Sequence, residues 1–246
     1  MKKVLGFILL TVTFLGSTHF ALSQTTSVVY DDNAQVRKVP AFTAIKVSSA
    51  IDLYLSQSNE AKVAVSASND EIRNHIITEV QGGTLIIKLG ENGTWFDWKK
   101  WGNYKTKAYV SVKDLYSIIA SGASDIHFVN TLEQPKLKLS LTGASDVKGE
   151  VSLGALYLDC TGASNVELKG TAEDAVIKMT GASDAKLYDL KLKAVDISAT
   201  GACNVKISVS EVLKVTATGA SDVYFKGNPI TKNINTSGAS NVRKKD

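Results

Sequence analysis

A five-residue unit of small and polar residues recurs seven times in the second half of this 246-residue chain. Each copy has Ser or Thr, then Gly-Ala, then Ser or Cys, and ends in Asp or Asn. Successive glycines are separated by 21, 19, 19, 20, 18 and 19 residues, which indicates a stacked architecture with one structural unit in each copy. The repeat glycines are Gly122, Gly143, Gly162, Gly181, Gly201, Gly219 and Gly238.

The residues around each unit alternate between apolar and polar side chains with a period of two. The position four before the Gly is always Ile, Leu or Val, and the position five before it is mostly polar. The position four after the Gly is Ile, Val or Ala, and the next one is again mostly polar. This pattern predicts two short strands in each copy, with the apolar side chains facing inward and the unit at the bend.

These features predict an all-β fold, namely a right-handed parallel β-helix (a β-solenoid) with coils of about 19 residues. A helical repeat is excluded because no i, i+3, i+4, i+7 pattern is present and every copy contains Gly. Propeller blades need about 40–45 residues, roughly twice this period. We expect the Gly at each bend to have positive φ, and the Ser, Thr, Asp and Asn side chains to form turn and inter-coil hydrogen bonds.

The front third of the chain also alternates, but in longer segments such as 51–55 and 84–89. We therefore expect a single β-solenoid domain over residues 37–246, with a modified N-terminal portion. The segment Ser49-Ala50-Ile51-Asp52-Leu53 resembles a degenerate copy of the unit. Terminal coils are usually atypical because they cover an open core. Residues 24–36 are polar and are expected to form a lead before the domain.

Residues 1–23 have the features of a secretory signal peptide. Lys2 and Lys3 precede a short apolar run, and Ala21-Leu22-Ser23 fits the small-x-small cleavage pattern. The run is shorter than the ~20 residues of a spanning helix, and we expect no transmembrane segment after cleavage. The protein is therefore expected to be exported to the periplasm, to the cell surface or to the medium. Cleavage lowers the formal charge from +4 to +2, which argues against nucleic acid as a partner.

A Trp-rich insert at about residues 90–107 interrupts the β pattern. All three Trp residues of the chain fall within seven positions of it, interleaved with lysines. Aromatic rings of this kind stack on sugars or fill pockets on a partner protein, so the insert is a candidate ligand-binding segment. The alternative is that its aromatic residues pack on the solenoid as a lid. The candidate residues are Trp95, Phe96, Trp98, Trp101 and Tyr104.

The other polar residues predict neither a catalytic site nor a metal site. The column of Asp and Asn that ends the units could attract Ca²⁺, but Asn interrupts it and leaves only Asp125 and Asp146 as charged neighbours. The chain has no nucleophile elbow, HExxH or P-loop, so we expect no enzyme activity, no catalytic residues and no cofactor. Cys160 and Cys203 lie two coils apart, which is too far for a disulfide, and are predicted to be free, buried thiols.

With these motifs, the chain resembles the bacterial family described as putative auto-transporter adhesin, head GIN domain. The resemblance covers about residues 37–242 and depends on segments 39–47, 51–55 and 83–87, and above all on the serial units. It implies a secreted or surface-associated right-handed β-helical protein and supplies no catalytic residues. Trp-rich residues 95–104 match no motif of the family.

The leading functional hypothesis is a non-enzymatic envelope protein that acts as an adhesin by binding a glycan or an envelope or host protein. One alternative is a structural or sensory envelope module that binds another protein. A third hypothesis is a carbohydrate-active enzyme built on a β-helix. The oligomeric state does not follow from the sequence.

Overall fold

The computed structural model describes residues 31–90 and 104–246, in which the chain forms seventeen strands and one short helix. The expected signal peptide and most of the Trp-rich insert lie outside these residues. The elements of the N-terminal portion are β1 (Gln35–Arg37), β2 (Ala44–Val47), β3 (Ile51–Gln57), β4 (Lys62–Ala67), α1 (Asp70–Asn74), β5 (Ile76–Gln81), β6 (Thr84–Leu89) and β7 (Thr106–Val112). The repeat region comprises β8 (Ser117–Gly122), β9 (Ile126–Phe128), β10 (Leu132–Gly143), β11 (Asp146–Gly162), β12 (Asn165–Gly181), β13 (Asp184–Gly201), β14 (Asn204–Gly219), β15 (Asp222–Lys226), β16 (Thr231–Thr236) and β17 (Asn241–Lys244).

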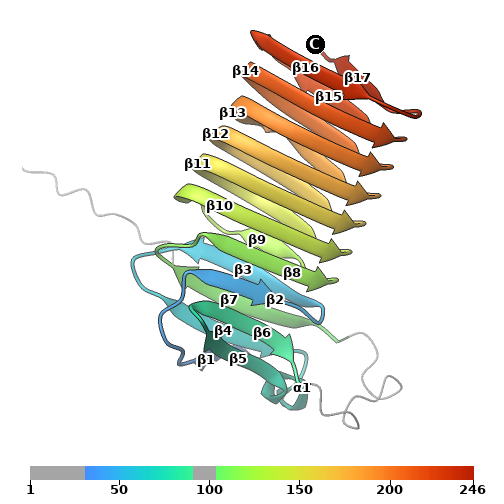
Figure 1. Cartoon of the computed structure of the whole chain (residues 1–246). Coiled ribbons are helices and arrows are strands. Elements are labelled where there is room, and N and C mark those ends of the chain that lie inside the picture. The colour runs from blue at the N-terminus through green and yellow to red at the C-terminus, as the bar shows by residue number, and fades with distance from the viewer. Residues whose placement is uncertain (1–30, 91–103) are drawn as a thin grey trace, which may run out of the picture.

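The repeat region is a β-solenoid, as the sequence predicted. Strands β10 to β14 are long, and each pairs in parallel with the next, so that the coils form a stack (Figure 1). The repeat glycines pair with one another from coil to coil, for example Gly162 with Gly181. A step of about 19 residues along the chain therefore equals one step along the stack.

Each turn unit is closed by hydrogen bonds between neighbouring coils. The backbone of Gly181 has a φ of +100°, and a Cβ at this position would lie 2.5 Å from the carbonyl oxygen of Gly162. The same oxygen accepts a hydrogen bond from the N–H of Ala182 at 2.8 Å and from the hydroxyl of Ser183 at 3.2 Å. Glycine is therefore needed at this position both for its conformation and for its lack of a side chain.

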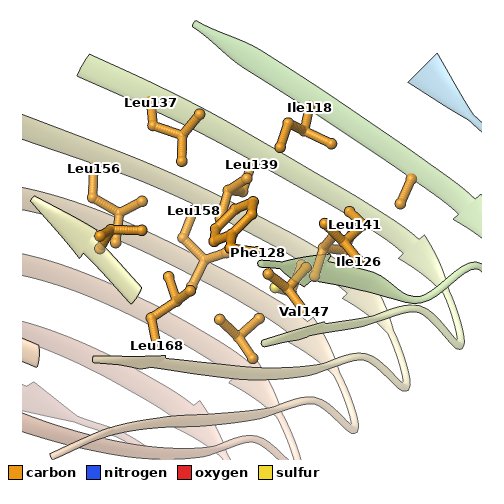
Figure 2. Packing of buried hydrophobic residues seen from close by; sticks show 14 of the residues in the cluster. Ile118, Ile126, Phe128, Leu137, Leu139, Leu141, Val147, Leu156, Leu158 and Leu168 are labelled. Carbon is orange, nitrogen blue, oxygen red and sulfur yellow. The ribbon is translucent and has the colours of Figure 1, made fainter. Parts of the chain in front are cut away.

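The core consists of aliphatic side chains that stack in register from coil to coil. Leu139, Leu158 and Ile177 occupy the same inward position of three coils and are at most 1% exposed. Figure 2 shows the ring of Phe128 among leucines of neighbouring coils. The next coil along the chain has Gly149 beside this ring, where a Cβ would lie 2.4 Å from the Cβ of Phe128. The bare backbone of this glycine thus makes room for the ring.

The layers of the N-terminal portion do not follow the order of the chain. Strand β2 lies between β6 and β8, and β3 lies between β7 and β9, all in parallel. The degenerate copy forms a turn beneath the first repeat unit, in which Ser49 occupies the glycine position with a φ of +66°. Antiparallel strands close the base of the stack, because β5 pairs with β6, β4 with β7, and β1 with β4.

Strand pairing starts ahead of residue 37, the expected beginning of the domain. Strand β1 pairs with β4 from Gln35 onward. Before it, the carboxylate of Asp31 accepts hydrogen bonds from the Nζ of Lys107 at 3.1 Å and from the hydroxyl of Tyr109 at 3.0 Å. The last part of the polar segment 24–36 is thus attached to the domain by backbone and side-chain bonds.

Both cysteines are free and buried, as predicted. Burial raises the pKa of the Cys160 thiol to about 12, so the thiol stays protonated at neutral pH. Since both thiols are buried and the Cys160 thiol is in addition protonated, we expect neither cysteine of the native protein to react with a maleimide within an hour at pH 7. In denaturant, both should be labelled, giving a mass increase of two adducts. Rapid native labelling of Cys160 would contradict its buried placement.

Candidate functional site

A groove of about 490 Å³ lies on the surface of the repeat region. It spans four successive coils, from β11 to β14, on the strand segments that follow the repeated turns. We call it the lysine–tyrosine groove. Its lining residues are Lys148, Gly149, Glu167, Leu168, Lys169, Lys186, Tyr188, Asp189 and Lys206.

Strand alternation produces rows of outward side chains that run along the trough. On β12, Glu167 and Lys169 point outward, and Leu168 between them points into the core, with 1% of its surface exposed. The parallel register places Lys148, Glu167, Lys186 and Lys206 side by side on successive coils, where they form the first row. The groove therefore crosses the strands and follows the direction of the stack.

Strand β13 supplies an aromatic ring and a carboxylate to the groove, next to an irregularity of its register. The register of β13 against β14 shifts between Leu187 and Lys191, so that the coil of β13 accommodates extra residues. Tyr188 and Asp189 lie in this bulge, and the hydroxyl of Ser208 on the next coil donates to the carbonyl oxygen of Tyr188 at 2.6 Å. Bulges commonly redirect side chains next to functional sites. Tyr188 faces outward by the same alternation as Lys186, and Asp189 is a second consecutive outward residue at the bulge.

The groove has a positive charge, because its lining contains four lysines and two carboxylates. Lys169 is paired with Glu150 at 3.1 Å. No ion pair joins Lys148, Lys186 or Lys206 to a carboxylate within residues 31–90 and 104–246. These three ammonium groups are therefore available to an external anion.

Two tyrosines of this face contact lysines. The Nζ of Lys226 lies 5.0 Å from the ring centre of Tyr188, and that of Lys245 lies 5.1 Å from the ring centre of Tyr224. Burial, with a smaller effect of the Tyr224 phenol, raises the pKa of Tyr188. The Tyr188 hydroxyl consequently keeps its proton at physiological pH and can donate a hydrogen bond to a ligand.

The Asp and Asn column on the same face is longer than the sequence suggested. Asp52 of the degenerate copy lies next to Asp125, so three carboxylates, including Asp146, occupy successive layers. Burial, followed by the charge of Asp125, raises the pKa of Asp52. Asp146 accepts two hydrogen bonds from Asn165, one from its backbone N–H and one from its side-chain amide. The column thus closes turns, and no group of three or more His, Cys, Asp and Glu side chains that could hold a metal is present in the described part of the chain.

Of the five candidate residues of the Trp-rich insert, one, Tyr104, lies within the residues that the structure describes. Trp95, Phe96, Trp98 and Trp101 lie outside the described residues. Tyr104 is half-buried and packs against the hydrophobic core. For Tyr104, this contact agrees with the alternative in which the aromatic residues pack on the solenoid.

Sequence reasoning missed the lysine–tyrosine groove, although part of its signal is visible in the sequence. Three of the seven positions five residues after a repeat Gly are Lys148, Lys186 and Lys206. This periodicity shows that lysines recur on one face. The trough and the bulge beside Tyr188 appear only when neighbouring coils are placed together.

The fold defines a β-solenoid protein, and a family comparison makes the assignment more specific. Residues 41–229 match the model of the family described as putative auto-transporter adhesin, head GIN domain. Because the match covers well over half of the chain, the chain belongs to this family. The match confirms the family expected from the sequence. No curated protein matches the chain.

Several solved bacterial structures share this fold. A putative adhesin from Bacteroides fragilis superposes with a TM-score of 0.76 at 21% identity, over 86% of this chain and 95% of that one. A putative lipid binding protein from Parabacteroides distasonis gives 0.65 at 16% identity, over 88% and 98%. A putative adhesin from Parabacteroides merdae gives 0.62 at 18%, over 87% and 95%. At such identities the likeness establishes the fold alone.

A search of the described residues for a helix long and apolar enough to cross a membrane finds none. Membership of the adhesin-like family suggests that the protein is exported.

Proposed function

We propose that the protein is an exported, non-enzymatic binding protein of adhesin type that recognises a glycan on the outer face of its solenoid. The observation that carries the proposal is the lysine–tyrosine groove, a preformed trough with hydrogen-bond donors, acceptors and an aromatic ring on one rigid face. Its volume of about 490 Å³ lies within the range of small-molecule and oligosaccharide pockets.

The rigidity of the scaffold supports a binding role. The side chains of the groove are attached to strands that pair on both sides with neighbouring coils. Groups on such strands keep their relative positions before the ligand arrives, which reduces the entropy lost on binding. The Trp-rich insert, with Trp95, Trp98 and Trp101, remains a second proposed contact region, based on the sequence.

A glycan array tests this proposal directly. The purified protein should bind a restricted set of glycans, and mass spectrometry of recovered glycan should show no change in mass. The triple variant Trp95→Ala, Trp98→Ala, Trp101→Ala should bind more weakly if the insert contributes contacts. Unaltered binding of this variant would exclude the insert from the site without affecting the groove.

Other outcomes would favour the competing functions. Specific capture of one envelope protein, together with no glycan binding at any concentration tested, would replace this proposal by a structural or sensory module. Shortened glycan products formed by the wild type would instead indicate a carbohydrate-active enzyme.

A further inference from the structure

We infer that the ligand of the lysine–tyrosine groove is a linear glycan that carries carboxylate or sulfate groups and lies along the stack across β11 to β14. The inference rests on the proposed glycan-binding function and adds the chemical class and orientation of the ligand. Three observations support it: the charge of the groove, its direction, and the mixture of polar groups along its sides.

The charge of the groove favours an anionic ligand. Lys148, Lys186 and Lys206 lie at the same position of three coils and have no carboxylate partner in the described part of the chain. Lys186 and Lys206 are direct neighbours on adjacent coils, so their ammonium groups repel each other, and an anion bound between them reduces this repulsion. A hydrogen bond between an ammonium group and a carboxylate or sulfate is also stronger than one between neutral groups.

The direction of the groove favours an extended chain. The groove crosses four coils, and coils stack at ~4.8 Å, so its lining spans roughly 14 Å. A sugar residue in an extended glycan advances by about the width of one coil. Two or three consecutive sugars can thus place their substituents at equivalent positions of successive coils.

The carboxylates of the groove distinguish a glycan from other polyanions. Glu167 occupies the lysine row between Lys148 and Lys186, and Asp189 lies in the bulge of β13. Both are acceptors, which sugar hydroxyls can satisfy by donating hydrogen bonds. The sugar-phosphate backbone of DNA has no hydroxyl groups along its length that could donate to these carboxylates. A bilayer is also a poor match, because large exposed apolar side chains such as Tyr157, Ile230 and Ile234 are not among the lining residues.

A matched pair of double variants tests the inference. Lys186→Gln with Lys206→Gln removes two charges from the groove. Lys138→Gln with Lys214→Gln removes two charges from exposed positions on the strand segments that precede the turns. The four probes are alginate oligosaccharide for carboxylates, dextran sulfate for sulfates, unmodified dextran as the neutral glycan, and single-stranded DNA as a non-glycan polyanion. Vesicles containing phosphatidylglycerol provide the membrane arm.

We expect the wild type to bind alginate oligosaccharide or dextran sulfate, with preference between the two identifying the anionic group. The groove variant should bind at least about tenfold more weakly, since two charged hydrogen-bond donors are lost. The control variant should bind within about twofold of the wild type. Affinity should fall as salt concentration rises, by less in the groove variant. Circular dichroism spectra of both variants should match the wild type.

Four results would overturn the inference. These are equal loss in both variants, equal affinity for DNA, equal affinity for the vesicles, and binding to unmodified dextran that the groove variant retains. Selective binding of a neutral glycan that the groove variant loses would overturn the anionic class and leave the proposed function intact. Failure of the wild type to bind any array glycan would overturn the proposed function itself.

Discussion

Gly181→Ala should lower the free energy of unfolding by about 3 kcal/mol, whereas Gly122→Ala should lower it by only about 1 kcal/mol. Both glycines have positive φ, +100° and +81°, so both substitutions carry the same kind of backbone strain. At Gly181 the new Cβ would also lie 2.5 Å from the carbonyl oxygen of Gly162. At Gly122 its nearest neighbour would be the backbone nitrogen of Ser49 at 3.7 Å.

This difference separates the two reasons for glycine in the repeat. Gly122 stacks on the degenerate turn at Ser49. Gly181 stacks on the turn of Gly162, and the carbonyl oxygen of Gly162 points at Gly181. Urea unfolding followed by circular dichroism would measure both variants, with Gly83→Ala as an additional control that has positive φ and open space around it. Equal losses at Gly181 and Gly122 would mean that φ alone determines the requirement and that coil contact contributes nothing.

Phe128→Ala should destabilise the protein by about 4 kcal/mol and should exceed the loss caused by Phe225→Ala by about 2 kcal/mol. Both side chains point inward and are at most 9% exposed. The Phe128 ring lies under the bare backbone of Gly149, within a region where every strand is paired on both sides. The surrounding leucines are therefore held in place and cannot collapse into the space left by the ring (Figure 2).

Phe225 provides the matched comparison because it lies near the other end of the stack. Its strand, β15, is followed by only one further layer, in which Lys244 occupies the paired position. A cavity there can be relieved by movement of the terminal coil or by entry of water. Thermal unfolding monitored by circular dichroism would compare the two variants. A loss at Phe225 equal to or larger than that at Phe128 would contradict the interpretation that Gly149 and Phe128 form a tightly packed pair.

The same stacking that makes these substitutions costly also positions the proposed binding groups. Lys186 and Lys206 belong to adjacent coils and are kept side by side by the backbone pairing of β13 with β14. A change in the number of residues in one coil would shift every outward side chain of that coil relative to its neighbours. The bulge at Tyr188 absorbs the additional residues locally, so that the turns on either side keep Gly181 paired with Gly201.

The sequence by itself determined the repeating part of the fold. Every coil contacts mainly the coils before and after it, so a local pattern repeated at a fixed step is enough to specify the inward residues, the turns and the stacking. The buried cysteines and the glycine at each bend followed from their places in this pattern. The degenerate copy at Ser49 was recognisable for the same reason.

Only the tertiary structure decided the order of the N-terminal layers and the site. Strands β2 and β3 lie between layers formed by later residues, and this arrangement depends on pairings between distant segments that no local pattern encodes. The lysine–tyrosine groove combines side chains about 19 residues apart with a bulge in β13. Its charge and shape come from the contact of neighbouring coils, so they exist only in the stacked chain.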